Sequence, residues 1–185
     1  MLIIGITGTL GAGKGTIVDY LVEYKHFKHY SVRSFLIDEI EKRQLSVNRD
    51  NMVIVANEMR AKFSPSYITD QLYEKAILSG QNCIIESIRT PGEIESLREK
   101  GNFYLFAIDA QAKIRYERIV IRNSETDKIS YDTFIQNETR EMDTKDPTKQ
   151  NLTKCIEMAD FLFENSGSME NLHKKVEEIL QKISA

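Results

Sequence analysis

The chain has 185 residues, a length that predicts one domain, since soluble domains average about 150 residues. Hydrophobic residues make up 41% of the sequence and charged residues 29%, a composition that excludes collagen-like, coiled-coil and wholly disordered chains. The 25 basic and 28 acidic residues give a net charge of −3. The chain therefore has no overall positive field of the kind that non-specific nucleic-acid binding needs, and any anion site has to be local.

The N-terminal segment MLIIGIT is apolar, but it has no basic flank and runs directly into Gly8. We expect neither a signal peptide nor a membrane span there. Cys83 and Cys155 are far apart and belong to no CxxC motif, which argues against a disulfide framework or a structural zinc site. We expect a cytoplasmic monomer or small homo-oligomer that binds small-molecule nucleotides, with no nucleic-acid or membrane partner.

Short apolar segments alternate with segments of helical periodicity along the chain. Taken in order, strands are predicted at 2–7, 29–31, 82–87, 103–109 and 161–164, with helices at 14–24, over much of 32–80, and at 91–100, 112–122, 131–142 and from 168 onward. Strands separated by helices need crossover connections, which are typical of a parallel sheet. We predict a single domain over 1–185, an α/β three-layer sandwich with a five-stranded parallel sheet.

The glycine-rich segment GTLGAGKGT follows the first predicted strand and opens the first predicted helix, which is the context of a phosphate-binding loop. Its glycines let backbone N–H groups point into one concavity, the helix N-terminus adds positive potential, and Lys14 reaches the β and γ phosphates. A dinucleotide motif would need glycine at Thr16, and a plain tight turn would leave the lysine unexplained. The predicted ATP contacts are Gly8, Thr9, Leu10, Gly11, Ala12, Gly13, Lys14, Gly15 and Thr16.

Ligands of such sheets bind at the carboxyl ends of the strands, so the residues that follow each strand are further candidates. Asn165, Gly167 and Ser168 follow the last strand and are predicted nucleotide contacts. Glu86 ends the third strand, where an acid can hold the water shell of Mg²⁺. The residue after Lys14, usually a Ser or Thr that binds this metal, is Gly15, so the hydroxyl of Thr16 is the other metal candidate.

The GxGKGT ending of the loop resembles that of the nucleoside monophosphate kinases, such as adenylate kinase. The chain is also similar, over most of its length, to dephospho-CoA kinase and related archaeal adenylate-kinase-like proteins, through the segments KIRYER at 113–118 and ADFLFENSGS at 159–168. The resemblance implies a P-loop kinase with a helical acceptor-binding region at about 32–80 and a helical lid at about 115–142.

The resemblance to these kinases makes several residues, most of them arginines, candidate ligands of the acceptor. The segment ESIRT resembles the Asp-Gly-Phe-Pro-Arg-Thr segment of adenylate kinases with one residue fewer, which makes Arg89 a candidate ligand of the acceptor phosphate. Ser31 and Arg33 follow the second strand, where these kinases begin their acceptor site, and Arg60 lies on a helix that would close over it. The alternatives are a surface salt bridge for Arg89 and solvated helix charges for Arg33 and Arg60.

Arg115, Arg118 and Arg122 are spaced so that one side of a helix carries all three guanidinium groups. Resemblance to the kinase lid implies that Arg118 and Arg122 clamp the transition state, with Arg140 on the next helix as a further candidate. The alternative is a solvated basic face that is neutralised by Glu117 and Glu125.

The function favoured by these residues is transfer of the γ-phosphoryl group of ATP, with Mg²⁺, to a small molecule. A hydroxyl acceptor such as dephospho-CoA needs a carboxylate that takes its proton, and the first acids after the second strand, Asp38 and Glu39, come more than a helical turn later. We therefore expect a nucleoside or deoxynucleoside monophosphate as acceptor, with dephospho-CoA as the alternative. A P-loop ATPase without an acceptor, or a regulatory nucleotide-binding protein, is the alternative from another class.

Overall fold

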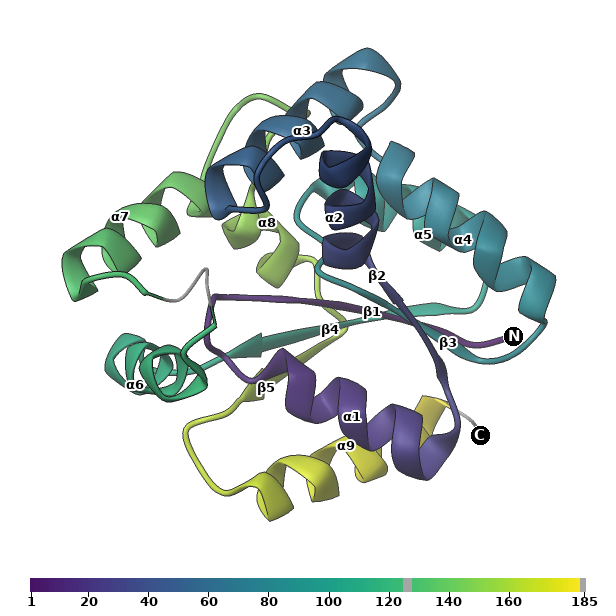
Figure 1. The fold of residues 1–185 in the computed structure, drawn as a ribbon. Coiled ribbons are helices and arrows are strands. Elements are labelled where there is room, and N and C mark those ends of the chain that lie inside the picture. The colour runs from purple at the N-terminus through teal and green to yellow at the C-terminus, as the bar shows by residue number, and fades with distance from the viewer. Residues whose placement is uncertain (125–127, 184–185) are drawn as a thin grey trace.

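The computed structural model describes residues 1–124 and 128–183. Its five strands form one parallel sheet in the order β2-β3-β1-β4-β5, with helices on both faces (Figure 1). The strands are β1 (Ile3–Gly8), β2 (Lys28–Ser31), β3 (Cys83–Glu86), β4 (Phe103–Asp109) and β5 (Phe161–Glu164). The helices are α1 (Lys14–Lys25), α2 (Val32–Lys42), α3 (Arg49–Lys62), α4 (Tyr67–Ser79), α5 (Pro91–Glu99), α6 (Ala112–Arg122), α7 (Tyr131–Met142), α8 (Leu152–Glu157) and α9 (Met169–Ile183). The predicted three-layer α/β sandwich with a five-stranded parallel sheet is confirmed.

The central strand β1 is buried along its whole length, as its unbroken apolar sequence predicts. It pairs with β3 and β4, with Ile6 beside Glu86 and Gly8 beside Ile108. Glu86 and Gly8 therefore emerge at the same carboxyl edge of the sheet, and Asp109 ends β4 one residue beyond this register. This edge is where parallel sheets bind ligands.

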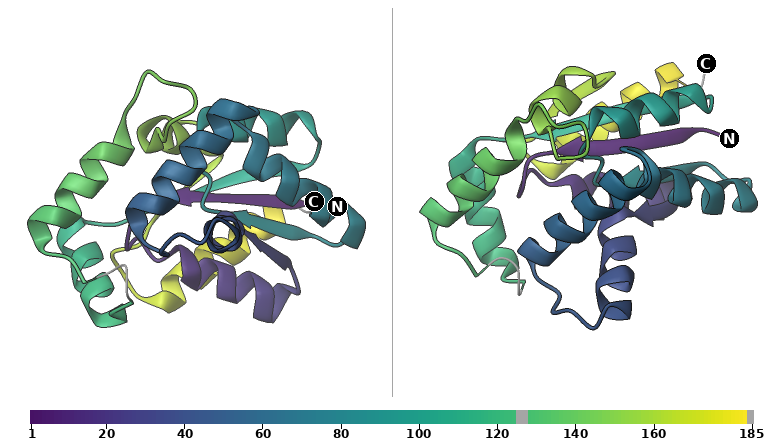
Figure 2. Two further views of the ribbon diagram at one scale, coloured as in Figure 1. Left: turned by 45° about the horizontal axis from the view of Figure 1, so that its top comes forward. Right: turned by 90° about the horizontal axis from the view of Figure 1, so that it is seen from above.

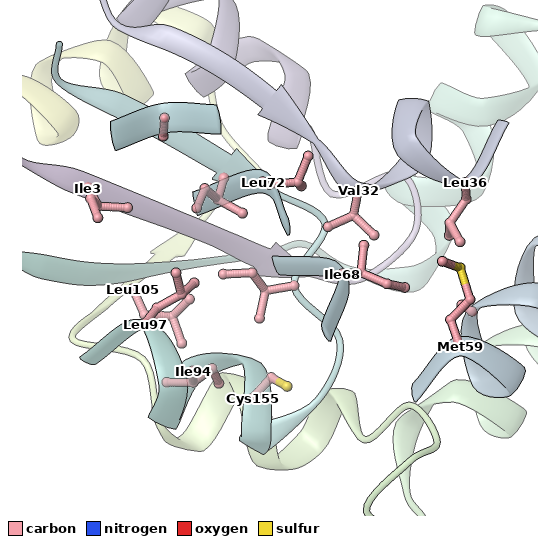
Figure 3. Close-up of a cluster of buried hydrophobic side chains, with 14 of the residues drawn as sticks. Ile3, Val32, Leu36, Met59, Ile68, Leu72, Ile94, Leu97, Leu105 and Cys155 are labelled. Atoms are coloured by element: carbon pink, nitrogen blue, oxygen red, sulfur yellow. The ribbon is translucent and has the colours of Figure 1, made fainter. Parts of the chain in front are cut away.

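Two apolar clusters hold the three layers together. The helices α1 and α9 pack on one face, where Leu21 and Val176 are fully buried with the side chains of alternate β1 residues. The other face is covered by α2, α3, α4, α5 and α8, whose cluster includes Ile68 and Leu97 (Figure 3). Burying such side chains stabilises the fold by about 1.5–3 kcal/mol each.

The helices α6 and α7 lie at the carboxyl end of the sheet, apart from the two covering layers (Figures 1 and 2). The residues 125–127, which belong to the predicted lid between these helices, lie outside the described residues. Among the described residues, no helix is both long enough and apolar enough to cross a membrane.

Besides one-residue shifts at the ends of other elements, the structure differs from the predicted elements at α8 and at the third strand. The helix α8 was not predicted, because its six residues are too few to show a helical period; it begins where the Asn151 side chain accepts a hydrogen bond from the Lys154 backbone N–H at 2.9 Å. The third strand is shorter than 82–87. The Asn82 side chain accepts a hydrogen bond from the Leu2 N–H, and Ser87 turns the chain with a φ of 75°.

Candidate active site

The glycine-rich segment forms a tight loop between β1 and α1. Gly11 and Gly13 have φ values of 78° and 91°, a region that glycine occupies most readily. A Cβ on Gly11 would lie 2.4 Å from the Arg115 carbonyl oxygen, and one on Gly13 would lie 2.3 Å from Nδ2 of Asn165. Glycine is therefore required at both positions by the backbone angle and by close packing.

Side chains from distant elements fix the shape of this loop. Thr9 Oγ1 donates to Oδ1 of Asp109 at 2.6 Å, and Asn165 Nδ2 donates to the Ala12 carbonyl at 2.8 Å. A buried Arg115 donates to the Leu10 carbonyl at 3.2 Å. These contacts hold the backbone from the outside and leave the concave side of the loop open, as a preorganised anion site needs.

Lys14 begins α1, and its ammonium group is held on the loop itself, where Nζ donates to the carbonyls of Gly8 at 3.0 Å and Thr9 at 2.8 Å. Desolvation, followed by the charge of Arg89, lowers the pKa of Lys14 to about 7. An anion bound beside Lys14 favours the charged ammonium and raises this pKa. The geometry thus suits a bound phosphate that replaces the two carbonyls as the hydrogen-bond partner of Lys14 Nζ.

One cavity of about 590 Å³ opens over this loop. Predicted site residues that line it are Leu10, Gly11, Gly13, Lys14, Gly15, Thr16, Arg33, Arg60, Glu86, Arg89, Arg118 and Arg122. Predicted site residues outside its lining are Gly8, Thr9, Ala12, Ser31, Asn165, Gly167 and Ser168. The structure therefore brings the loop, the end of the third strand and two arginines of α6 together around one space.

The residues outside the cavity have other surroundings. Ser31 caps α2 by accepting a hydrogen bond from the Ser34 N–H at 3.2 Å. Asn165 supports the loop from behind, and with Gly167 and Ser168 it lines a second cavity of about 310 Å³ beside the start of α9.

Arg89 forms an ion pair with a buried partner that the sequence did not suggest. Its guanidinium donates to Oε2 of Glu141 at 2.9 Å, and Arg49 donates to Oε1 of the same carboxylate at 2.5 Å. Glu141 is 4% exposed, and all three side chains line the cavity. Glu141 sits late in α7 and Arg49 begins α3, so only the folded chain reveals that they meet; no local spacing signals it.

Arg60 is buried rather than solvated, with 1% of its surface exposed. It donates to Oε1 of Glu93 at 3.0 Å, while Oε2 of Glu93 accepts from the backbone N–H groups of Arg89 at 2.7 Å and Thr90 at 3.0 Å. This carboxylate closes the capping box of α5. It thereby links the Arg60 side chain to the backbone that carries Arg89.

The two metal candidates, Thr16 and Glu86, both line the cavity. Burial disfavours the charge of Glu86, but a hydrogen bond from His29 and the nearby Lys14 outweigh it and lower the pKa of its carboxyl below the usual value. An ionised carboxylate and a hydroxyl fit Mg²⁺, which prefers hard oxygen ligands and keeps several waters. The described residues contain no group of three or more His, Cys, Asp or Glu side chains that could hold a metal by themselves.

The three arginines of α6 do not share one environment, contrary to the expectation from their spacing. Arg115 is buried, donates to the Ala110 carbonyl at 2.6 Å and pairs with Glu138 at 2.6 Å. Arg118 and Arg122 line the cavity. On the next helix, Arg140 pairs with Asp50 at 3.1 Å outside the cavity lining. Glu125, the proposed neutralising partner, lies outside the described residues.

Curated relatives match this chain over nearly its whole length. The chain is 29% identical over 191 residues to a UPF0200 protein of Methanocaldococcus jannaschii, covering 99% of this chain and 91% of that protein. It is 26% identical over 186 residues to a UPF0200 protein of Methanothermobacter thermautotrophicus, covering 100% of this chain and 92% of that one.

Among solved structures, a shikimate kinase from Bacteroides thetaiotaomicron aligns with a TM-score of 0.63 and 13% identity over 97% of this chain and 98% of that one. TT1252 from Thermus thermophilus aligns with a TM-score of 0.63 and 17% identity over 98% and 97% of the two chains. These likenesses show a P-loop kinase-like fold. A family model described as an AAA domain matches residues 4–146, which is most of the chain, and the protein therefore belongs to this AAA domain family.

Proposed function

We propose that the protein is a phosphotransferase that moves the γ-phosphoryl group of ATP to the phosphate of a nucleoside or deoxynucleoside monophosphate. The observation that carries the proposal is the placing of Arg89 and Arg49 in the same cavity as the phosphate loop. One cavity thus offers two separate anion sites, one for the donor phosphates and one for an acceptor that is itself an anion.

The charge of the cavity lining supports two anionic ligands. Seven cationic side chains line it, namely Lys14, Arg33, Arg49, Arg60, Arg89, Arg118 and Arg122, against three carboxylates, Asp19, Glu86 and Glu141. Arginine presents a planar fork that matches the oxygens of a phosphate. This excess of positive charge is the complement expected for a triphosphate together with a monophosphate.

The surroundings of the acceptor site do not favour a hydroxyl acceptor. Asp38, the first acid after β2 in the sequence, is exposed and does not line the cavity. Asp19, which does line it, belongs to α1, the helix that follows the phosphate loop. Glu86 does line it, but its lowered pKa makes it a weak proton acceptor. A phosphate acceptor is already ionised near neutral pH and needs no base, so it suits this lining better.

In the proposed reaction an acceptor phosphate oxygen attacks the γ-phosphorus, and the bond between that phosphorus and the β,γ-bridging oxygen breaks. Lys14, Arg118 and Arg122 stabilise the charge on the transferring group, and Arg89 orients the acceptor. Mg²⁺, when bound beside Thr16 and Glu86, would supply further charge neutralisation. These side chains position and stabilise; no covalent intermediate with the protein is needed.

The test is a coupled assay with ATP and Mg²⁺ over a panel of nucleoside and deoxynucleoside monophosphates, dephospho-CoA and shikimate. We expect nucleoside diphosphate from at least one monophosphate. Phosphorylation of dephospho-CoA or shikimate alone would replace the acceptor by an alcohol. Release of inorganic phosphate without any phosphorylated acceptor would identify an ATPase instead.

A further inference from the structure

Glu141 and the two arginines of the proposed acceptor site come from three separate parts of the fold. Glu141 lies in the last turn of α7, Arg49 begins α3, and Arg89 lies between β3 and α5. Oε1 of Glu141 accepts from Arg49 at 2.5 Å, and Oε2 accepts from Arg89 at 2.9 Å. One carboxylate thus bridges two guanidinium groups with its two oxygens.

This bridge has the form in which arginines bind a phosphate. Carboxylate and phosphate groups both present pairs of anionic oxygens, and a guanidinium fork binds either. The side chains of Arg49 and Arg89 keep 20% and 16% of their surface exposed and line the cavity, whereas that of Glu141 is 5% exposed. The two arginines can therefore be reached from the cavity, and a carboxylate of the chain itself already occupies them.

Charge favours the replacement of this carboxylate by a phosphate. Desolvation lowers the pKa of Arg49, and the charge of Glu141 opposes that shift, so an anion beside Arg49 stabilises its charged form. A phosphate monoester carries nearly two negative charges at neutral pH, because its second pKa is about 6. The phosphate thus neutralises both guanidinium groups, whereas the carboxylate neutralises only one of the two charges.

The helix that carries Glu141 forms a unit with α6. Among the described residues, neither of the two apolar clusters of the core includes a side chain of α6 or α7. These helices pack on each other instead: the rings of Tyr116 and Phe134 lie 5.6 Å apart, and Arg115 pairs with Glu138 at 2.6 Å. A movement of α7 is therefore passed to α6 and to its two arginines in the cavity lining.

Ion pairs join this unit to α3. Glu141 pairs with Arg49 in the interior, and its neighbour Arg140 pairs with Asp50 at 3.1 Å on the surface. The surface pair is exposed and contributes little to stability. The buried pair is thus the stronger of the two, and it is the one that an anion in the cavity can replace.

We propose that Glu141 is an internal occupant of the acceptor-phosphate site, which the incoming acceptor has to displace from Arg49 and Arg89. The inference rests on the proposed function for the identity of the ligand. The displaced carboxylate does not stay buried, since a buried charge without a partner is costly, so the last turn of α7 moves away from α3. Because α7 packs on α6, this movement links acceptor binding to Arg118 and Arg122.

The test measures binding without turnover. The phosphate loop is filled with a non-hydrolysable ATP analogue and Mg²⁺, and inorganic phosphate is titrated calorimetrically into the wild type, Glu141→Gln and Asp50→Asn. In Glu141→Gln we expect phosphate to bind about 10- to 100-fold more tightly, the effect of one charged hydrogen bond, because a neutral amide no longer competes for the arginines. Asp50→Asn breaks only the surface pair and should bind phosphate like the wild type.

Two results of this titration would overturn the inference. Equal or weaker phosphate binding by Glu141→Gln would show that the carboxylate does not compete with the ligand. Equal tightening in both variants would show that the gain comes from a loosened contact between α7 and α3, and not from freed arginines.

A second measurement leaves Glu141 in place. Both native cysteines are buried, so spin labels can be attached selectively to Gln136→Cys on α7 and Leu78→Cys on α4, two exposed positions outside the cavity lining. Adding phosphate to the analogue-bound protein should change the distance between the labels. An unchanged distance at saturating phosphate would show that α7 keeps its place, and the inference would fail.

The same data separate this inference from the proposed function. If Glu141→Gln gains affinity for phosphate but the acceptor panel yields no nucleoside diphosphate, the proposed function fails and Glu141 is still the occupant of an anion site. If a nucleoside diphosphate is formed but Glu141→Gln gains no affinity, the proposed function stands and this inference fails.

Discussion

Arg89 and Glu141, which are 52 residues apart in the sequence, form an ion pair of 2.9 Å between the segment before α5 and the helix α7. Glu141 also binds Arg49, so one buried carboxylate holds two guanidinium groups at the proposed acceptor site. The two guanidinium groups and the one carboxylate together retain a net positive charge for an incoming anion. The carboxylate also spaces the two arginines, which would otherwise repel each other.

Glu141→Gln should lower the stability of the ligand-free protein, because it leaves two largely buried guanidinium groups without their counter-charge. Loss of one partner of a buried pair costs about 3–5 kcal/mol. An anionic acceptor should restore part of this loss, so the rise in unfolding midpoint on adding a monophosphate should be larger than for the wild type. Glu58→Gln, which removes an exposed partner of Arg43, is the control. Equal ligand-induced shifts in both variants would count against an anion site at these arginines.

Lys14→Ala should leave the fold intact and lower kcat by about 10²–10³-fold, since it removes one preorganised charge at the transferring phosphoryl group. The matched control is Lys113→Ala, which changes an exposed lysine of α6 outside the cavity lining. Circular dichroism checks that the fold is intact, and steady-state kinetics measure the fall in kcat. Near-normal turnover by the Lys14 variant with every active acceptor would contradict the phosphoryl-transfer mechanism.

The pKa of Lys14 also predicts a pH dependence of stability. Its folded-state value of about 7 is below the ordinary 10.5, so between these two pH values the unfolded chain binds more protons than the folded one. Stability therefore rises with pH over this window, and the burial penalty of the charged lysine is full below it. Denaturant unfolding of the wild type, relative to Lys14→Met, should show this rise from pH 7 to 10. A constant difference between the two proteins would show that the lysine keeps its ordinary pKa.

Arg122→Ala should lower kcat more than it weakens ATP binding, because a lid arginine meets its full charge complement only in the transition state. Arg140→Ala is the control on the neighbouring helix, since Arg140 pairs with Asp50 outside the cavity lining. Kinetics and equilibrium ATP titration separate the two effects. A fall in ATP affinity alone would make Arg122 a ground-state ligand.

Arg89→Lys should raise the acceptor KM sharply and leave the ATP KM nearly intact, because lysine cannot reproduce a two-point contact with a phosphate. Arg98→Lys, at a surface pair with Asp160, controls for the substitution itself. Asp38→Asn should have little effect, since a phosphate acceptor has no proton that must be removed. The opposite pattern, with Asp38→Asn inactive and Arg89→Lys active, would indicate a hydroxyl acceptor.

The sequence allowed the sheet, the phosphate loop and the strand ends to be predicted, because these depend on local patterns. An apolar segment before glycines and Lys14 defines a strand, a loop and a helix within a short window. Glu86 and Arg89 could be singled out because they follow a strand. Each of these signals lies in neighbouring residues.

The partners across the cavity could not be predicted in this way. In the sequence, Glu141 is one acid among several of an amphipathic helix, and only the folded chain brings it into contact with Arg49 and Arg89. Arg60 likewise has the sequence context of a surface charge, but in the structure it donates to Glu93. Similarly, the spacing predicted one helix side for Arg115, Arg118 and Arg122, but the Arg115 side chain turns to Glu138 and to loop carbonyls. Pairings of this kind depend on tertiary contacts, which periodicity does not encode.

The hydrogen bond from Asn165 to the Ala12 carbonyl joins positions 153 residues apart. The hydrogen bond from Thr9 to Asp109 joins positions 100 residues apart. The phosphate loop is synthesised before both of these supports, which come from β4 and from the residue after β5. A nascent chain that ends before β5 would therefore carry the complete glycine motif without its finished shape. Nucleotide binding should thus become possible only after β5 and Asn165 have joined the folded sheet.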